Sequence, residues 1–122
     1  MGDNLFTATS PLGYTVECSR KTWNIHVISE EGHYIMKGNE EVVKKTITEP
    51  IKIYESSQTP ERHVYFGEST CASYNNDYYT KVIVVCKNDK NTANLVTTFP
   101  TEKMRGGINE ERVLYDKKDN ET

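Results

Sequence analysis

The sequence lacks several features that mark common classes of protein. It has no apolar stretch close to the ~20 residues that a membrane helix needs. Its N-terminus has no basic segment followed by an apolar run, so no signal peptide is visible. None of the cysteines, Cys18, Cys71 and Cys86, forms a Cys-x-x-Cys pair, which leaves a zinc knuckle and a redox motif unsupported. We therefore expect a cytoplasmic protein with free thiols, or a domain of a larger protein that is delivered into a target cell's cytoplasm.

The chain also lacks the excess of basic residues that is typical of nucleic-acid-binding domains. It has 15 Lys and Arg against 18 Asp and Glu, which gives a formal net charge of -3. Affinity for a phosphate backbone comes largely from basic side chains, so this balance argues against tight, non-specific binding to nucleic acid. The acidic residues concentrate at Glu40–Glu41, at Glu110–Glu111 and in residues 116–121, which leaves room for a local basic cleft on another face.

With 122 residues the chain has the length of one domain. One helix is predicted at Glu40–Thr48, because Asn39 suits the N-cap and the two leading acids suit the positive end of the helix dipole. Pro50 ends this helix. Alternating or continuous apolar residues predict strands at 14–18, 22–28, 51–54, 63–66, 78–86, 93–99 and 112–115, and Pro100 is expected to end the strand before it.

The order of these elements predicts an α+β fold. We expect an antiparallel sheet of about four strands packed against one main helix. A single domain is expected to cover residues 14–116. Residues 1–13 are interpreted as a flexible arm or an edge segment, and residues 117–122 as a disordered tail. Residues 73–77 are expected to form an exposed loop, and residues 87–91 a hairpin turn.

Several short motifs occur in an order that resembles one nuclease superfamily. His33 precedes a Met-x-Gly step, an acidic helix start and a closing proline. Arg62 precedes an aromatic strand, which a Tyr-x-Lys-Val strand and a Val-Thr-x-Phe strand follow. The series, from Trp23 to Thr101, resembles the phage-associated nucleases of the barnase–EndoU–colicin–RelE-like superfamily. The matching residues are Trp23, His26, His33, Met36, Gly38, Glu40, Glu41, Pro50, Ile53, Arg62–Phe66, Tyr79–Val84 and Val96–Phe99.

The resemblance implies a barnase/RelE-like fold and a metal-independent endoribonuclease that needs no cofactor. In this reaction a base removes the 2'-hydroxyl proton of RNA, that oxygen attacks the adjacent phosphorus, and an acid protonates the leaving 5'-oxygen, which gives a 2',3'-cyclic phosphate. Histidine titrates near physiological pH, so His33 and His26 are the candidate acid and base. Arg62 and Lys81 are candidates for holding the phosphate, and Thr97 is an auxiliary hydroxyl donor.

Three further residues are candidates for substrate binding. They are His63, Lys103 and Arg105. The candidates also have structural interpretations. A histidine beside aromatic residues is commonly a packing residue, and Arg62 has Glu61 and Glu55 as alternative ion-pair partners. Lys81 lies in an apolar strand, so its amine either emerges at an edge or points into a cleft. The Gly-Gly loop after Arg105 either swings over a substrate or is simply exposed.

Two other chemistries have little support. Glu30 and Glu31 are adjacent and point to opposite faces of a strand, so they do not form the carboxylate pair of a glycosidase. No histidine pair has the i, i+4 spacing of a helical metal site, and no metal site is predicted.

The chain also departs from the superfamily pattern in ways that bear on function. The family's His-Pro dipeptide is His33-Tyr34 here, and the net charge is acidic. A catalytically inactive protein-binding module on the same fold, or a phage structural or accessory protein, is therefore the alternative. The expected partners of the enzyme are an RNA substrate and, for a toxin, an acidic immunity protein or antitoxin that covers the basic cleft. No membrane partner is expected.

Overall fold

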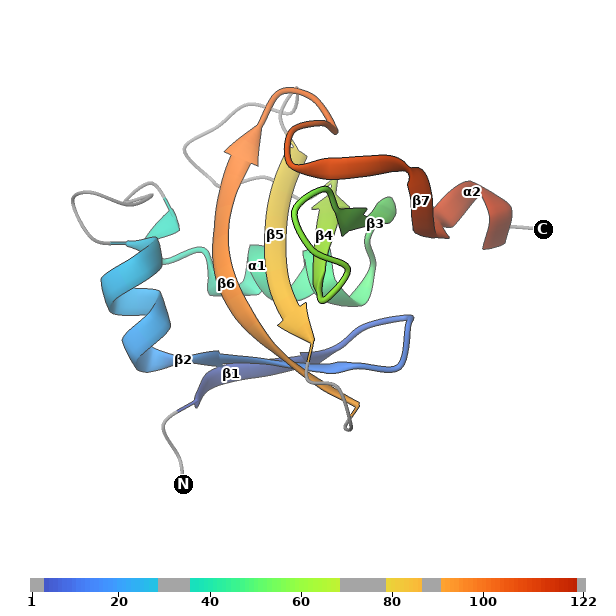
Figure 1. Cartoon of the computed structure of the whole chain (residues 1–122). Coiled ribbons are helices and arrows are strands. Elements are labelled where there is room, and N and C mark those ends of the chain that lie inside the picture. Colours follow the sequence, from blue (N-terminus) through green and yellow to red (C-terminus); the bar gives the residue numbers. More distant parts are fainter. Residues whose placement is uncertain (1–3, 29–35, 69–78, 87–90, 121–122) are drawn as a thin grey trace.

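The computed structural model describes residues 4–28, 36–68, 79–86 and 91–120 (Figure 1). The side chains of His26, Asp119 and Asn120 are not part of this description. The expected loop at residues 73–77 and most of the expected turn at residues 87–91 lie outside the described residues.

Seven strands form one mixed, mostly antiparallel sheet in the order β1-β2-β6-β5-β4-β3-β7. Strands β2 and β6 pair in parallel, and the other neighbouring pairs are antiparallel. The fold is therefore α+β, with one main helix and a larger sheet than the four strands expected. The elements are β1 (Asn4–Thr9), β2 (Thr15–Ser19), η1 (Thr22–Val27), α1 (Glu40–Thr48), β3 (Lys52–Ser56), β4 (Arg62–Gly67), β5 (Tyr79–Cys86), β6 (Thr92–Thr101), β7 (Ile108–Asp116) and α2 (Lys117–Asn120).

The prediction for residues 22–28 is wrong, because Thr22–Val27 form a π-helix, η1, instead of a strand. The apolar residues at Trp23, Ile25 and Val27 fit a two-residue period, but the protein uses a helical one. Trp23 and Val27 are buried in the core, whereas Ile25 is 53% exposed. Burial at positions four apart, with the residue between them in solvent, is the pattern of a helix face.

The two ends of the chain also contain regular structure. Residues 4–9, within the stretch interpreted as a flexible arm or an edge segment, form the edge strand β1. Residues 117–120, within the expected disordered tail, form the short helix α2. Pro100 lies inside β6 and does not end it, because this strand continues to Thr101 beside the start of β5.

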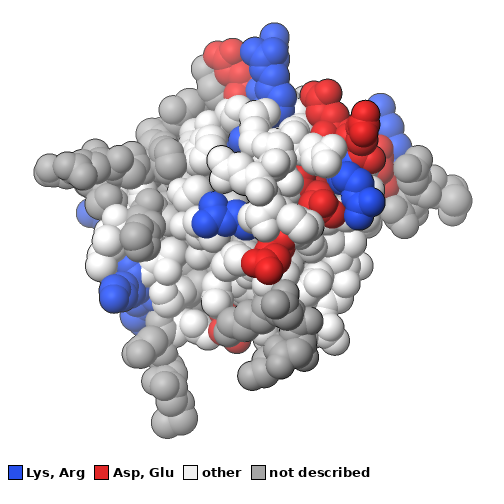
Figure 2. Space-filling view, viewed as in Figure 1, with Lys and Arg blue, Asp and Glu red and all other residues white. Residues whose placement is uncertain are grey.

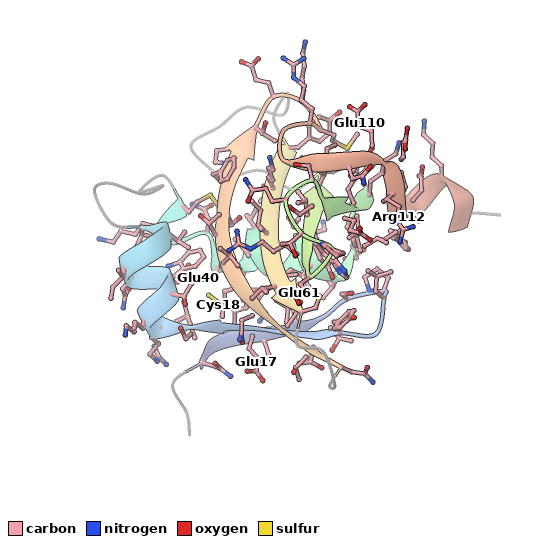
Figure 3. The ribbon with its side chains drawn as sticks, in the orientation of Figure 1. Glu17, Cys18, Glu40, Glu61, Glu110 and Arg112 are labelled. Carbon is pink, nitrogen blue, oxygen red and sulfur yellow. The ribbon has the colours of Figure 1, made fainter. Side chains whose placement is uncertain are left out.

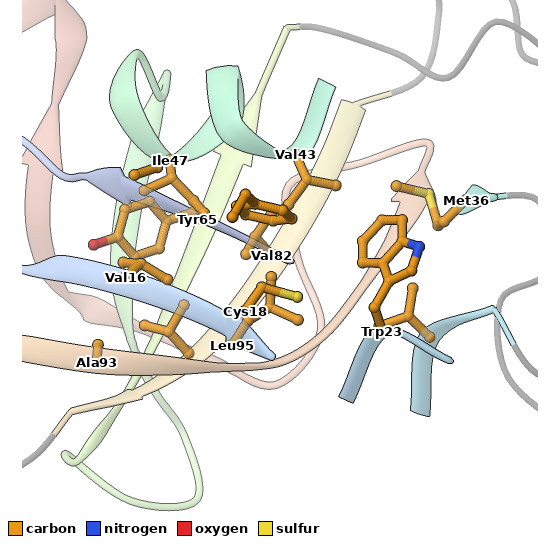
Figure 4. Packing of buried hydrophobic residues seen from close by; sticks show 14 of the residues in the cluster. Val16, Cys18, Trp23, Met36, Val43, Ile47, Tyr65, Val82, Ala93 and Leu95 are labelled. Carbon is orange, nitrogen blue, oxygen red and sulfur yellow. The ribbon is translucent and has the colours of Figure 1, made fainter. Parts of the chain in front are cut away.

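The main core lies between α1 and one face of the sheet (Figure 4). Val43 and Ile47 of α1 are fully buried, and Tyr65 of β4 and Val82 of β5 belong to the same cluster. In Figure 1, α1 lies behind the sheet and packs on β1, β4 and β5. Helix α1 has the predicted bounds, although Asn39 makes no side-chain capping bond and instead donates to the carbonyl oxygen of Lys37.

A second, smaller apolar cluster covers part of the opposite face of the sheet. Tyr54, Val64 and Phe66 are buried there, and Ile83, Met104 and Ile108 pack against them. Met104 and Ile108 belong to the segment that joins β6 to β7 and to the start of β7. The segment between these two strands therefore folds over the sheet face that α1 leaves uncovered.

Candidate functional site

The candidate phosphate-holding residues Arg62 and Lys81 lie on the sheet face opposite α1. Side chains alternate between the two faces of a strand, and residues directly opposite each other on paired strands share a face. Arg62 is two residues before Val64, and Lys81 pairs with Phe66. Because Val64 and Phe66 form the second cluster, Arg62 and Lys81 point away from α1.

A pocket of about 130 Å³ lies between these two basic residues and the segment that joins β6 to β7. Arg62, Lys81, Gly106 and Gly107 contribute to its wall, together with Ser56, Gln58, Val64 and Ile83. The sheet therefore brings two predicted site residues, from strands β4 and β5, to one small cavity. Gly106 and Gly107 both have positive φ, 91° and 69°, a conformation that favours glycine in this wall.

The amine of Lys81 is almost completely buried, with 6% of the residue exposed. Its Nζ donates to the carbonyl oxygens of Arg105, at 3.3 Å, and Gly106, at 2.6 Å. The rings of Phe66 and Phe99 flank the amine, with their centroids 5.6 and 5.3 Å from Nζ. Burial lowers the pKa of Lys81. Of the two positions expected for this side chain, the structure shows the one that points into a cleft.

Arg62 is half-buried at the start of β4. Among the residues that the structure describes, no carboxylate forms an ion pair with its guanidinium. Glu55, one of its expected alternative partners, instead pairs with Arg112 at 3.3 Å. The guanidinium thus lines the pocket without an ion pair to a described acid, and it has donors that suit an anionic ligand.

Thr97 lies on the same face of the sheet as Lys81. It pairs with Ile83 of β5, which packs on the second cluster. Thr98 points to the other face, is fully buried, and donates its hydroxyl to the carbonyl oxygen of Lys81 at 2.8 Å. Thr97 therefore faces the same side of the sheet as the pocket, as its predicted role requires, but it is not one of the residues that line the pocket.

Lys103 and Arg105 are exposed on the segment between β6 and β7. They line a shallow hollow of about 190 Å³ with Thr101 and Glu102. Arg105 touches the Lys81 pocket through its main chain only, by accepting the bond from Nζ. Both side chains therefore lie beside the pocket and outside its wall.

His63 lies on the opposite side of the sheet from Arg62, because adjacent residues in a strand point to opposite faces. It is buried on the α1 side, where its Nδ1 lies 3.4 Å from Sγ of Cys86 and its ring meets that of Tyr14 edge to face. Burial lowers the pKa of His63, and the nearby carboxylate of Glu55 acts in the opposite direction. The structure does not bring His63 together with Arg62, Lys81 or Thr97, the described candidates on the opposite face.

The candidate acid and base have no described geometry. His33 lies outside the described residues, and the side chain of His26 is not described, although its backbone belongs to η1. The segment that contains His33 runs from Ile28 to Met36, and both of these end residues pack in the core on the α1 side. A pocket of about 300 Å³ lies near these ends, lined by Leu5, Arg20, Trp23, Asn24, Ile28, Lys37, Gly38 and Glu40.

The face that carries the Arg62 and Lys81 pocket is not uniformly basic. Figure 2 shows few charged side chains near its centre and charges of both signs toward its upper and right edges. Glu110 and Arg112 lie on β7 at the right in Figure 3, and Glu61 lies near the start of β4. The local basic cleft that a nuclease needs is therefore limited to the few side chains of the pocket and the neighbouring loop.

Sequence reasoning missed the contact between Cys86 and His63. The signal was available only in three dimensions, because 22 residues separate the two in sequence while β4 and β5 place them side by side. Over the described residues, no three His, Cys, Asp or Glu side chains gather in a way that could hold a metal ion. No helix within the described ranges is long and apolar enough to cross a membrane.

The chain was also compared with known proteins. No protein family, curated protein or solved structure matches the chain.

Proposed function

We propose that this chain is a metal-independent endoribonuclease on a barnase/RelE-like sheet, which cleaves RNA by attack of the 2'-hydroxyl to give a 2',3'-cyclic phosphate. One observation carries the proposal. Arg62 and Lys81, which the motif order assigned to phosphate binding, line the same pocket on the same face of the sheet. Two cations at one small cavity form an environment that favours a phosphodiester.

Each pocket residue has a role that its chemistry suits. The guanidinium of Arg62 presents paired donors that match two phosphate oxygens. Lys81 uses two of its N–H groups on loop carbonyl oxygens, which leaves one for a ligand in the pocket that it lines. Thr97, on the same face, contributes a hydroxyl. Together these groups stabilise the negative charge that develops on the phosphorane.

The acid and base assignments rest on the resemblance alone. His33 is the proposed acid or base and His26 its partner, because an imidazole can take or give a proton near neutral pH. Lys103 and Arg105 are proposed to bind RNA phosphates that flank the cleaved bond, since both are exposed beside the pocket. For a toxin, an acidic immunity protein or antitoxin would cover these cations.

The test is cleavage of total tRNA by the purified full chain in EDTA, with analysis of the fragment ends. We expect 2',3'-cyclic phosphate ends and loss of cleavage in His33→Ala. Arg62→Gln should lower the rate by about 10²-fold, as removal of one donor to a transition-state oxyanion commonly does. Arg112→Gln is the matched control, because Arg112 lies on β7 and does not line the pocket. Folded protein that fails to cleave RNA, or that cleaves only with a metal ion, would contradict the proposal.

One observation favours the alternative, an inactive protein-binding module on the same fold. The amine of Lys81 is already bonded to two carbonyl oxygens of the loop, so its role can be to fasten that loop. An active ribonuclease should slow the growth of a host that expresses it, and His33→Ala should relieve this effect. Abundant expression of the unaltered chain with no growth defect would favour the binding module.

A further inference from the structure

A cluster of reactive side chains lies on the α1 side of the sheet, where the β1–β2 turn meets the adjoining ends of β4 and β5. Sγ of Cys86 lies 3.4 Å from Nδ1 and 3.8 Å from Nε2 of His63. The side chain of Tyr14 acts to lower the pKa of Cys86, and its ring meets the imidazole of His63 edge to face with centroids 5.6 Å apart. The thiol here has a base within contact distance and the side chain of Tyr14 nearby.

A carboxylate lies on the strand next to the imidazole of His63. Glu55 on β3 is directly opposite His63 on β4, and its charge favours the protonated imidazole. The order thiol, imidazole, carboxylate is the arrangement in which a base accepts the proton of a nucleophile while a third group stabilises the resulting cation. Cys86 is also partly exposed, whereas Cys18 is completely buried.

We propose that Cys86 is a peroxide-reactive thiol, with His63 as its base and Tyr14 as a positioning residue. This site is separate from the Arg62 and Lys81 pocket, because His63 and Arg62 point to opposite faces of the sheet. The proposal does not rest on the ribonuclease assignment, and each can fail without the other. A small oxidant suits the site because the thiol is only partly exposed.

The reaction balances with hydrogen peroxide as the oxidant. The sulfur attacks one peroxide oxygen, an S–O bond forms and the O–O bond breaks. The thiol proton passes to the imidazole of His63, and the leaving hydroxide takes a proton to become water. The sulfur loses two electrons to the peroxide, and the products are the sulfenic acid of Cys86 and one water molecule.

The thiol and imidazole are neutral at rest. Burial raises the pKa of Cys86, with the Tyr14 hydroxyl acting in the opposite direction, and burial lowers the pKa of His63. The thiol of Cys86 therefore reacts when the neutral imidazole of His63 can accept its proton. Once His63 is fully neutral, a further rise in pH no longer increases the rate of this reaction. Without the base, reaction must wait for the free thiolate and rises with pH. Among the described residues, the titratable groups that face the sulfur are His63, Tyr14 and Tyr65. Glu55 faces His63 and is itself paired with Arg112 at 3.3 Å.

The experiment measures sulfenic acid formation at Cys86 in the full chain. Protein is treated with hydrogen peroxide and dimedone between pH 7 and 8.5, and labelling is followed by mass spectrometry on the tryptic peptide 82–87, which contains only Cys86. The variants are His63→Gln and Tyr14→Phe. Tyr79→Phe, at the far end of β5, is the matched control. Labelling of buried Cys18 in the same digest reports unfolding.

We expect His63→Gln to slow the labelling of Cys86 at pH 7 by about tenfold, at the lower end of general-base effects. We also expect a nearly flat pH profile for the unaltered protein and a rise of about tenfold per pH unit for the variant. A slowing of less than threefold, or parallel pH profiles, overturns the proposal. If Cys18 becomes labelled in His63→Gln, that variant has unfolded, and the Tyr14→Phe variant is used instead. Labelling of Cys86 in Tyr14→Phe that is as fast as in Tyr79→Phe then overturns the proposal. Slower labelling of Cys86 in Tyr14→Phe supports it.

Discussion

Lys81 in the central strand of the sheet bonds to the backbone of Gly106, with Nζ 2.6 Å from the carbonyl oxygen. This bond joins β5 to a loop that is 25 residues further along the chain. The same loop accepts a second hydrogen bond, from the amide of Ser57 to the carbonyl oxygen of Gly107 at 2.9 Å. The loop that forms one wall of the candidate pocket is thus held in place by the lysine that lines it.

Lys81→Met is expected to loosen this loop locally without large loss of global stability. The ammonium is buried between Phe66 and Phe99, so an apolar side chain recovers part of the cost of burying a charge. The two loop carbonyls lose a charged donor, which is worth ~1.5–3 kcal/mol per bond in favourable cases. We expect the Ser57 amide to exchange with solvent at least about tenfold faster by hydrogen-exchange NMR, while the free energy of unfolding changes by less than ~1 kcal/mol.

Lys103→Met is the control for this change. Lys103 lies on the same segment and is exposed, and its amine makes no bond to the Gly106 carbonyl. Its exchange pattern should match that of the unaltered protein. Equal exchange at Ser57 in Lys81→Met and in the unaltered protein would show that the loop is held by its other contacts.

The parts of the fold that local sequence determines could be predicted. Helix α1 begins and ends at the predicted residues, because leading acids, a buried stripe at Val43 and Ile47 and a closing proline all lie within one short segment. The sheet was underestimated for two reasons. The places of β2 beside β6 and of β7 beside β3 depend on distant partners, and residues 4–9, which pair with the adjacent β2, show no strong period in the sequence. Burial of Trp23 and Val27 against distant strands likewise decided that η1 is a helix, and seven residues of sequence did not carry that information.

For the site, strand periodicity contained more information than was used. Alternation already places Arg62 and His63 on opposite faces of any strand that contains both, so they could not share a pocket. The shared face of Arg62 and Lys81, by contrast, depends on the register between β4 and β5, which no local pattern specifies. The contact of Cys86 with His63 depends on the same register.

Gly67→Ala is expected to destabilise the protein through a close approach of β4 to α1. A Cβ at this position would lie 2.7 Å from Oγ1 and 3.0 Å from Cβ of Thr46, which is itself buried. Because the helix backbone must shift, we expect a loss of about 1–3 kcal/mol in the free energy of unfolding, measured with urea. Glu68→Ala, next in sequence and exposed, should change it by less than ~0.5 kcal/mol.

A double variant tests whether this contact is the cause. Thr46→Ala removes Oγ1 and Cγ2, the two atoms nearest to the added Cβ. The combined loss in Gly67→Ala with Thr46→Ala should therefore be smaller than the sum of the two single losses. Additive losses would mean that the strain arises elsewhere.

The buried thiol of Cys18 should make stability fall at alkaline pH. Burial raises its pKa from the ordinary value of 9.0 to about 12. The folded state therefore keeps a proton that the unfolded chain releases, so stability is unaffected below pH 9 and is lost as pH rises from there toward 12. Between pH 8 and pH 10 this thiol should cost roughly 1 kcal/mol in the free energy of unfolding.

Urea unfolding at several pH values, compared between the unaltered protein and Cys18→Ala, measures this contribution. Cys18→Ala starts from a lower stability, because it leaves a small cavity, but it should lose less between pH 8 and pH 10. Other alkaline titrations are shared by the two proteins and cancel in the difference. Equal losses would mean that the thiol of Cys18 reaches solvent in the folded state.

The last prediction tests whether β1 is a packed edge strand or a flexible arm. Removing a buried side chain lowers the free energy of unfolding in the first case and leaves it unchanged in the second. Phe6 is 8% exposed and meets the ring of Trp23 edge to face, with centroids 6.1 Å apart. Phe6→Ala should therefore lower the free energy of unfolding by about 2–4 kcal/mol, as loss of a buried aromatic residue commonly does. Thr7→Ala is the matched control on the exposed side of the same strand and should change it by less than ~0.5 kcal/mol.

A double-mutant cycle with Trp23→Ala separates the ring contact from simple burial. Paired aromatic rings contribute ~0.5–1.5 kcal/mol beyond the area they bury, so the losses from Phe6→Ala and Trp23→Ala should overlap by about that amount. Phe6→Ala with the stability of Thr7→Ala would show that β1 is a free arm in solution. In that case β2 would become the edge of the sheet, and the core beside η1 would open to solvent on the side that β1 covers.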